Sequence, residues 1–160
     1  MQLSYNYNTP IGAAGGIVDL APHYIRSFTN EAAYGAVSFG MGLVNGTAAG
    51  SGVALPDSDS TAADFAGIVT NRRTTELDLE GNLSIRQKAA LGLMQYGCIY
   101  GLLATDVAPD YGDALYLVKS GDDAGKFTNS SSGTIAIKGR FLSGADNGVA
   151  IVELFNQAQA

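Results

Sequence analysis

The sequence predicts an all-β protein, namely a small β-barrel or sandwich-like domain preceded by an extended N-terminal arm. The 160-residue chain has the length of a single domain. It contains 21 glycines, 8 tyrosines and 6 phenylalanines, a composition that favours turns and strands over a helix bundle. Short β-prone runs alternate with turn residues about every eight to twelve positions, a spacing typical of barrels and sandwiches.

Three regions are expected along the chain. Residues 1–32 are predicted to form the extended arm, because two prolines and a pair of adjacent glycines interrupt any regular period there. Within this arm only a short helical turn around residues 21–28 is expected. Residues 33–156 are predicted to form the β-rich barrel domain, and residues 157–160 a frayed tail.

The strands expected in the first half of the domain are short, and glycine or proline ends most of them. They cover residues 36–39, 41–44, 53–55 and 65–69. Residues 76–86 alternate apolar with polar or charged side chains around a Glu-Gly-Asn turn, which predicts a β-hairpin.

The second half of the chain gives a clearer strand pattern. Two strands are expected near 91–96 and 98–105, because each glycine in this stretch would cost a helix about 1 kcal/mol. Further strands are expected at residues 114–119, 134–141 and 149–155, with turns at 121–125 and 143–148.

The first third of the chain is almost uncharged. Residues 1–55 carry only Asp19, Arg26 and Glu31 as full charges, and no charge occurs between Glu31 and Asp57. Solvated sheet edges are normally protected by charged side chains. Two explanations therefore stay open: the region is a buried sheet, or other chains of an assembly cover its surface.

Charge, hydropathy and cysteine content together argue against several partners and cellular locations. The net charge is −6 and the nine basic residues are scattered, which argues against nucleic acid. The long uncharged runs are broken by glycine and polar residues, so no membrane span is expected. No secretory signal is expected either, because the first residues lack a basic n-region and a continuous apolar h-region. Cys98 is the only cysteine and is expected to be a small buried hydrophobe, which fits a reducing compartment.

No catalytic pattern is complete. His23 is the only histidine, so a His-based triad or a multi-histidine metal site would rest on one residue. The acidic run that begins at Asp57 has Ala62 and Ile68 where a calcium loop needs glycine and glutamate. Turn aspartates are favoured there, while an irregular Ca²⁺ or Mg²⁺ site stays open. The loop 121–127 lacks one residue and the Ser/Thr of a phosphate-binding loop. We therefore expect no enzyme, no cofactor and no metal.

Nine short motifs in a fixed order resemble the structural cement, or head decoration, proteins of tailed bacteriophages. The resemblance covers roughly residues 9–155, and the segment 70–105 departs from the family pattern. The motifs are PIGAAGGIVD (10–19), SFTNE (27–31), VSFGMGLV (37–44), GVALP (52–56), FAGIV (65–69), GDALY (112–116), GKFT (125–128), GRFL (139–142) and GVAIVEL (148–154).

This resemblance implies a viral structural protein on the outer face of the virion capsid, made in the host cytoplasm. It implies binding to the major capsid protein, cementing of neighbouring subunits that stabilises the expanded head, and self-association as a homotrimer. The arm is expected to reach a second capsomer, so deleting residues 1–30 should weaken binding while the barrel stays folded. The alternative is a phage surface fibre or a receptor- or carbohydrate-binding β-module. A small hydrolase and a major capsid subunit are further alternatives.

Within this hypothesis, the interface is expected to use large side chains of the uncharged region, because aromatic groups give much contact area at small entropic cost. Core packing is the competing explanation for each apolar residue. The candidate interface residues are Ile17, Tyr24, Phe28, Tyr34 and Phe39, with Arg26, Arg72 and Arg73 as polar contacts to an acidic shell.

Overall fold

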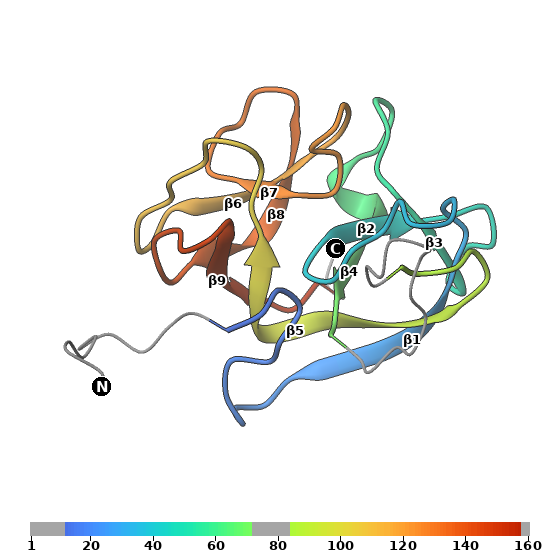
Figure 1. Cartoon of the computed structure of the whole chain (residues 1–160), viewed down its shortest axis with the longest axis horizontal. Helices are drawn as coiled ribbons and strands as arrows, with labels where there is room; N and C mark the ends of the chain where they lie inside the picture. The colour runs from blue at the N-terminus through green and yellow to red at the C-terminus, as the bar shows by residue number, and fades with distance from the viewer. Residues whose placement is uncertain (1–11, 72–83, 158–160) are drawn as a thin grey trace, which may run out of the picture.

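The computed structural model describes residues 12–71 and 84–157, and strands dominate this part of the chain (Figure 1). No helix in these two ranges is long and apolar enough to cross a membrane. The elements are β1 (Tyr24–Asn30), β2 (Gly42–Asn45), β3 (Gly52–Ala54), the 3₁₀ turn η1 (Ala62–Asp64), β4 (Phe65–Val69), β5 (Ala90–Leu102), β6 (Ala114–Val118), β7 (Phe127–Thr128), β8 (Thr134–Phe141) and β9 (Val149–Leu154).

The first five strands form a closed barrel. Their order is β1-β3-β2-β4-β5, and a further antiparallel pairing of β1 with β5 closes the ring. The β1–β3 pair is parallel, while the other neighbours are antiparallel. Closure satisfies the backbone groups that an open sheet would leave at its edges. The expected all-β barrel is thus confirmed.

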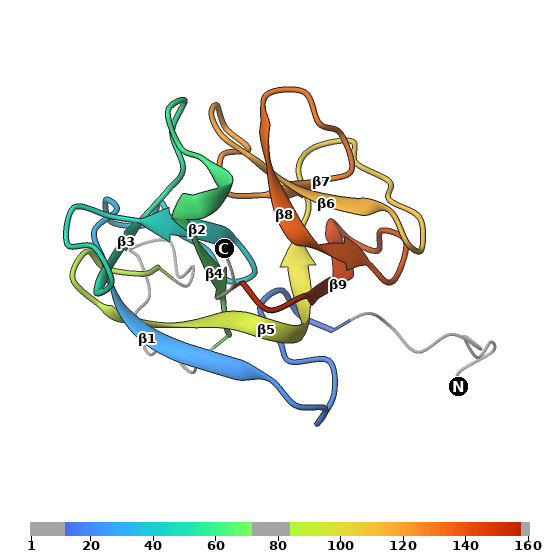
Figure 2. The same cartoon turned by 180° about the vertical axis from the view of Figure 1, so that it is seen from behind.

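The second sheet begins on the same long strand and continues in the order β5-β9-β8-β6-β7. Strand β5 pairs with β1 and β4 up to Tyr96, and it pairs with β9 from Gly97 onward. Gly97 has a φ of 118°, a value that L side chains rarely adopt, and Figures 1 and 2 show β5 turning upward along its length. One bent strand therefore stands where two strands were expected.

Two clusters of buried side chains form the core. One lies inside the barrel and includes Leu43 and Val53, both fully buried. The other lies under the second sheet, where it includes Phe127, and it extends to the barrel strands through Ile68 and Met94. Burying one such large apolar side chain is worth about 1.5–3 kcal/mol, so these clusters are the main source of stability.

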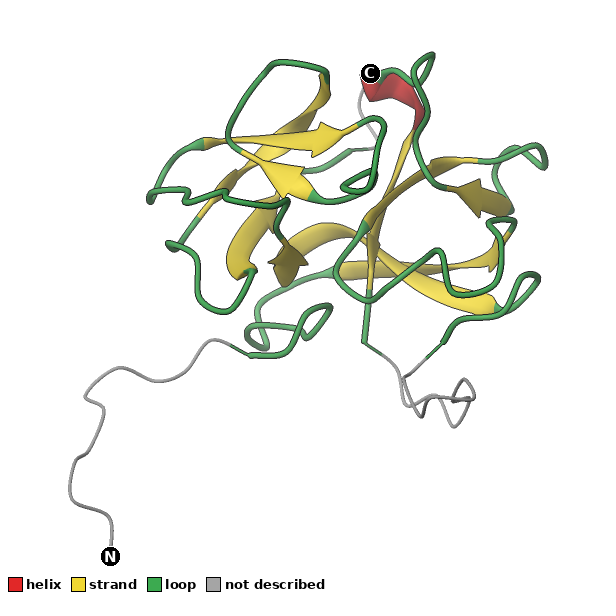
Figure 3. Cartoon of the chain, turned by 45° about the horizontal axis from the view of Figure 1, so that its top comes forward, coloured by secondary structure: helices red, strands yellow, loops and turns green. Residues whose placement is uncertain are grey.

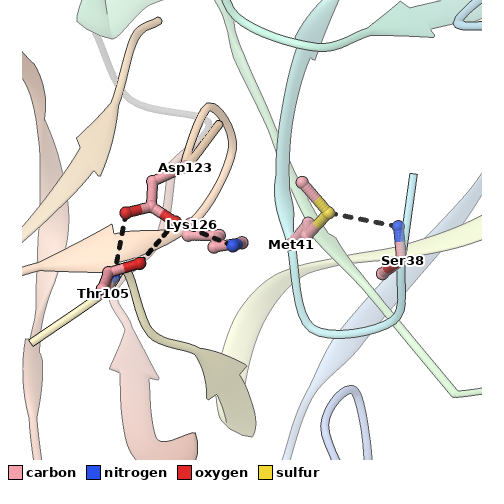
Figure 4. Close-up of polar contacts among 5 residues, drawn as sticks. All are labelled: Ser38, Met41, Thr105, Asp123 and Lys126. Atoms are coloured by element: carbon pink, nitrogen blue, oxygen red, sulfur yellow. Dashed lines mark hydrogen bonds and ion pairs between the residues drawn. The ribbon is translucent and has the colours of Figure 1, made fainter. Parts of the chain in front are cut away.

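Two expected elements of the first half are wrong. Residues 36–39 are not a strand, because Gly35 and Gly40 have positive φ and the chain turns between them. The turn is held by the Ser38 amide, which donates to Met41 Sδ at 3.1 Å (Figure 4). The strands expected at 65–69 and 134–141 coincide with β4 and β8.

The helical turn expected around residues 21–28 is also wrong, because Tyr24–Asn30 is the strand that closes the barrel. This strand lies inside the stretch that was expected to be arm. Of the predicted 76–86 hairpin, residues 76–83 lie outside the described residues, and 84–86 form no strand. Before β1, residues 12–18 lie along β5, where Gly15 donates to the Tyr100 carbonyl at 2.7 Å.

The turn at residues 121–125 is fastened to the end of β5. Asp123 accepts a hydrogen bond from the Thr105 amide at 2.9 Å and forms an ion pair with Lys126 at 2.7 Å (Figure 4). These contacts lower the pKa of Asp123, with the Lys126 bond as the largest cause. The link joins the β6–β7 connection to the segment that directly follows β5, the strand that both sheets share.

Candidate functional site

Burial accounts for much of the uncharged first third. Strands β2 and β3 come from this region, and Leu43 and Val53 are fully buried inside the barrel. Its only acidic group near the strands, Glu31, accepts hydrogen bonds from the amides of Thr47 at 2.7 Å and Ala48 at 3.0 Å. These bonds lower the pKa of Glu31. Only the exposed side chains of this region are available to form an interface with another chain.

An aromatic patch, made of Tyr24, Tyr96 and Phe155, lies where β1, β5 and the end of β9 meet. Tyr24 and Tyr96 are paired across β1 and β5, and β9 brings Phe155 alongside because Leu154 pairs with Gly97. The three side chains are 54%, 43% and 44% exposed. A cavity of about 290 Å³ opens beside them. It is lined by Tyr24, Gln95, Tyr96 and Asn156.

A loop at residues 18–23 protrudes next to this patch, as the segment leading into β1 at the lower edge of Figures 1 and 2. The Asp19 carboxylate accepts a hydrogen bond from the Ala21 amide at 2.9 Å, which holds the turn. Leu20 at its tip is 99% exposed. Just before the loop, Ile17 forms a bridge to Ile99 and is itself exposed.

The structure separates the predicted interface residues into exposed and buried groups. Tyr24 and Tyr34 are exposed, and Arg26 is exposed with its guanidinium 5.4 Å from the centre of the Phe28 ring. Phe28 belongs to the barrel core, so its side chain is not available to a partner. Phe39 is half-buried against the same core. The two predicted contacts Arg72 and Arg73 lie outside the described residues.

Four large exposed apolar residues were not among the predicted interface residues: Leu20, Tyr96, Tyr111 and Phe155. Leu20 stands between an aspartate and an Ala-Pro pair, which is a turn signal that predicts exposure. Tyr96 and Phe155 carry no such signal, because both lie in or beside apolar strands. Only the pairing of β5 with β1 and β9 brings them to the surface together.

The described residues contain no group of three or more His, Cys, Asp and Glu side chains that could hold a metal ion. Asp57 instead accepts hydrogen bonds from Ser60 and from the Asp59 amide, and these bonds lower its pKa. Asp64 is bonded in the same way to Thr61. Burial raises the pKa of the Cys98 thiol, followed by the negative charges of Asp19 and Glu153. A thiol in this setting is a poor nucleophile.

Comparison with known families matches residues 1–155 to a family described as "Structural cement protein (E217 gp24/Pam3 gp6)". No curated protein matches the sequence. A chain in the solved structure titled "The capsid of Myoviridae Phage XM1" is similar in fold, with a TM-score of 0.73, 19% identity and 96% of each chain covered. Because the family match spans nearly the whole sequence, this chain belongs to the phage structural cement protein family and is a structural protein of the virion.

Proposed function

We propose that this cement protein binds the outer face of an expanded phage head and bridges neighbouring major capsid subunits, and that it does so as a homotrimer. The observation that carries the proposal is the aromatic patch of Tyr24, Tyr96 and Phe155. Tyr24 and Tyr96 are presented to solvent by strands of the closed barrel, and Phe155 is presented by the residue that follows β9, whereas Phe28 on β1 and Leu154 on β9 are buried.

The chemistry of the patch suits a protein partner. Tyrosine and phenylalanine bury large areas at small entropic cost and are enriched at the centres of protein interfaces. The cavity between Tyr24 and Tyr96 offers a socket for one apolar side chain of the shell. Arg26 lies on the same strand as Tyr24 and supplies a cation at the rim.

The proposal also gives a role to the remaining surface. With a net charge of −6, decorated heads would repel one another and stay dispersed. Several subunit contacts on one particle add avidity, because each further contact forms at a high effective concentration. Such a role requires no catalytic group and no cofactor.

The test is stoichiometric binding to purified, expanded heads that lack the cement protein. Tyr24→Ser and Tyr96→Ser should each weaken binding by about tenfold or more, as expected for interface anchors. Tyr111→Ser is the matched control. Tyr111 is 71% exposed but lies outside the aromatic patch, just before β6, a strand of the second sheet. Failure of the wild-type protein to bind heads, or its binding to host glycans instead, would overturn the proposal.

A further inference from the structure

A shallow groove lies between the two halves of the molecule, beside the end of β9, where the Lys138 carbonyl on its rim accepts a hydrogen bond from the Phe155 amide at 2.9 Å. It has a volume of about 290 Å³. It is lined by Ala62 and Ala63 of η1, Phe65 of β4, Ala136 and Lys138 of β8, and Gln157. Phe65 is buried and forms an apolar floor, while the three alanines are exposed and too small to fill the space above it. The groove is therefore a socket for an apolar side chain.

The chain also presents an exposed apolar side chain, here called the knob, that suits this groove. Leu20 is 99% exposed at the tip of the 18–23 loop, so it has almost no contact with its own chain. The loop conformation is set by the hydrogen bond from the Ala21 amide to Asp19, and Pro22 further restricts the backbone. A leucine held outward on a restricted turn loses little freedom when it binds.

We propose that Leu20 of one copy inserts into the alanine-lined groove of a second copy of this chain. Two features favour this occupant. The groove is apolar and shallow, as a single leucine requires. The residue beside the knob, Asp19, is acidic, and the rim of the groove carries the exposed basic residue Lys138. Insertion of Leu20 would bring these opposite charges together at the edge of the contact.

The positions of knob and groove determine the type of assembly. The loop leading into β1 lies at the lower edge of Figures 1 and 2, whereas η1 lies in the upper half of both views, and Figure 3 shows η1 (red) far from the start of the described chain. The contact is therefore between different surfaces of the two copies. A heterologous contact closes into a ring when the rotation between copies permits it, and a ring of three agrees with the homotrimer of the proposed function, on which this inference rests.

The test measures mass in solution by light scattering, without capsids, so its outcome is independent of capsid binding. Wild-type protein should have three times the chain mass of 16.5 kDa. Leu20→Asp (knob lost) and Ala136→Tyr (groove filled) should each reduce the mass to that of one chain. Tyr111→Asp is the control for adding a charge at an exposed apolar site, and it should leave the trimer unchanged.

Mixing the two variants distinguishes a head-to-tail contact from a symmetric one. The Leu20→Asp copy keeps its groove and the Ala136→Tyr copy keeps its knob, so the mixture should form dimers with one intact contact. Lys138→Asp should weaken assembly, because it places a like charge beside Asp19 of the second copy.

Three results would overturn the proposal. The first is a wild-type protein that stays a single chain at all concentrations. The second is a full-size assembly in both single variants. The third is a Leu20→Asp protein that keeps its wild-type mass but loses binding to heads, which would show that the capsid is the occupant of the knob.

Discussion

The backbone of Gly97 lies directly against His23: a methyl group added at residue 97 would come within 2.7 Å of the His23 Cβ. This is the point at which β5 leaves the barrel and enters the second sheet. The close approach and the positive φ of 118° both require glycine here.

Gly97→Ala should therefore destabilise the protein by roughly 1–3 kcal/mol, through backbone strain and the clash with His23. Gly112→Ala is the matched control, because Gly112 has a φ of 91° but no atom within 4 Å of an added methyl group. Urea unfolding gives the free energy of unfolding of each variant. The difference between the two losses is the part that is due to the clash with His23 and not to backbone strain. Equal losses would show that the His23 contact is unimportant.

The Glu31 carboxylate should make stability depend on pH. Its pKa is held below the ordinary 4.5 by the amides of Ala48 and Thr47. The ionised form therefore stabilises the fold above this ordinary value, and the contribution is lost as the pH falls through the lower folded-state pKa. Glu31→Gln should lower the melting temperature near pH 7, and the difference from wild type should shrink in acid. Asp122→Asn controls for the loss of one charge. A difference that stays constant with pH would contradict the prediction.

Cys98 should react slowly with iodoacetamide in the folded protein. Burial raises its pKa above the ordinary 9.0, so less thiolate is present at any pH below that range. Glu153→Gln should speed the reaction, because Glu153 adds a negative charge and is bonded to Arg140, whose positive charge acts in the opposite direction. Rates in denaturant should be the same for both proteins. Equal rates in the folded state would exclude an electrostatic effect of Glu153.

Truncations at the N-terminus should have two distinct effects. Removing residues 1–30 deletes β1 and opens the barrel, so this variant should fail to fold, contrary to the expectation from the sequence. Removing only residues 1–11 leaves every described strand in place. If the arm contacts the shell, this shorter variant should fold normally and bind heads at least about tenfold more weakly. Circular dichroism and head-binding assays measure the two effects, and unchanged binding would exclude the arm as a contact.

Much of the candidate site was beyond sequence reasoning. Of the predicted interface residues on β1, Tyr24 is exposed, but Phe28, four positions later on the same strand, belongs to the core. Both are aromatic residues in the same, almost uncharged segment, so the sequence does not distinguish them. A barrel strand can bury one aromatic side chain and expose another. Tyr96 and Phe155 were missed for the same reason.

Local pattern by itself determined the all-β class, the bounds of β4 and β8, and the succession of motifs that resembles the cement proteins, because turn glycines and strand-forming residues act over a few positions. The tertiary structure alone decided that β1 closes the barrel against β5. It decided that β5 bends at Gly97, where it leaves the barrel and enters the second sheet. It also decided which aromatic side chains reach the surface. These features depend on pairing between residues far apart in the chain, such as Tyr24 with Tyr96, and no local pattern records such a pairing.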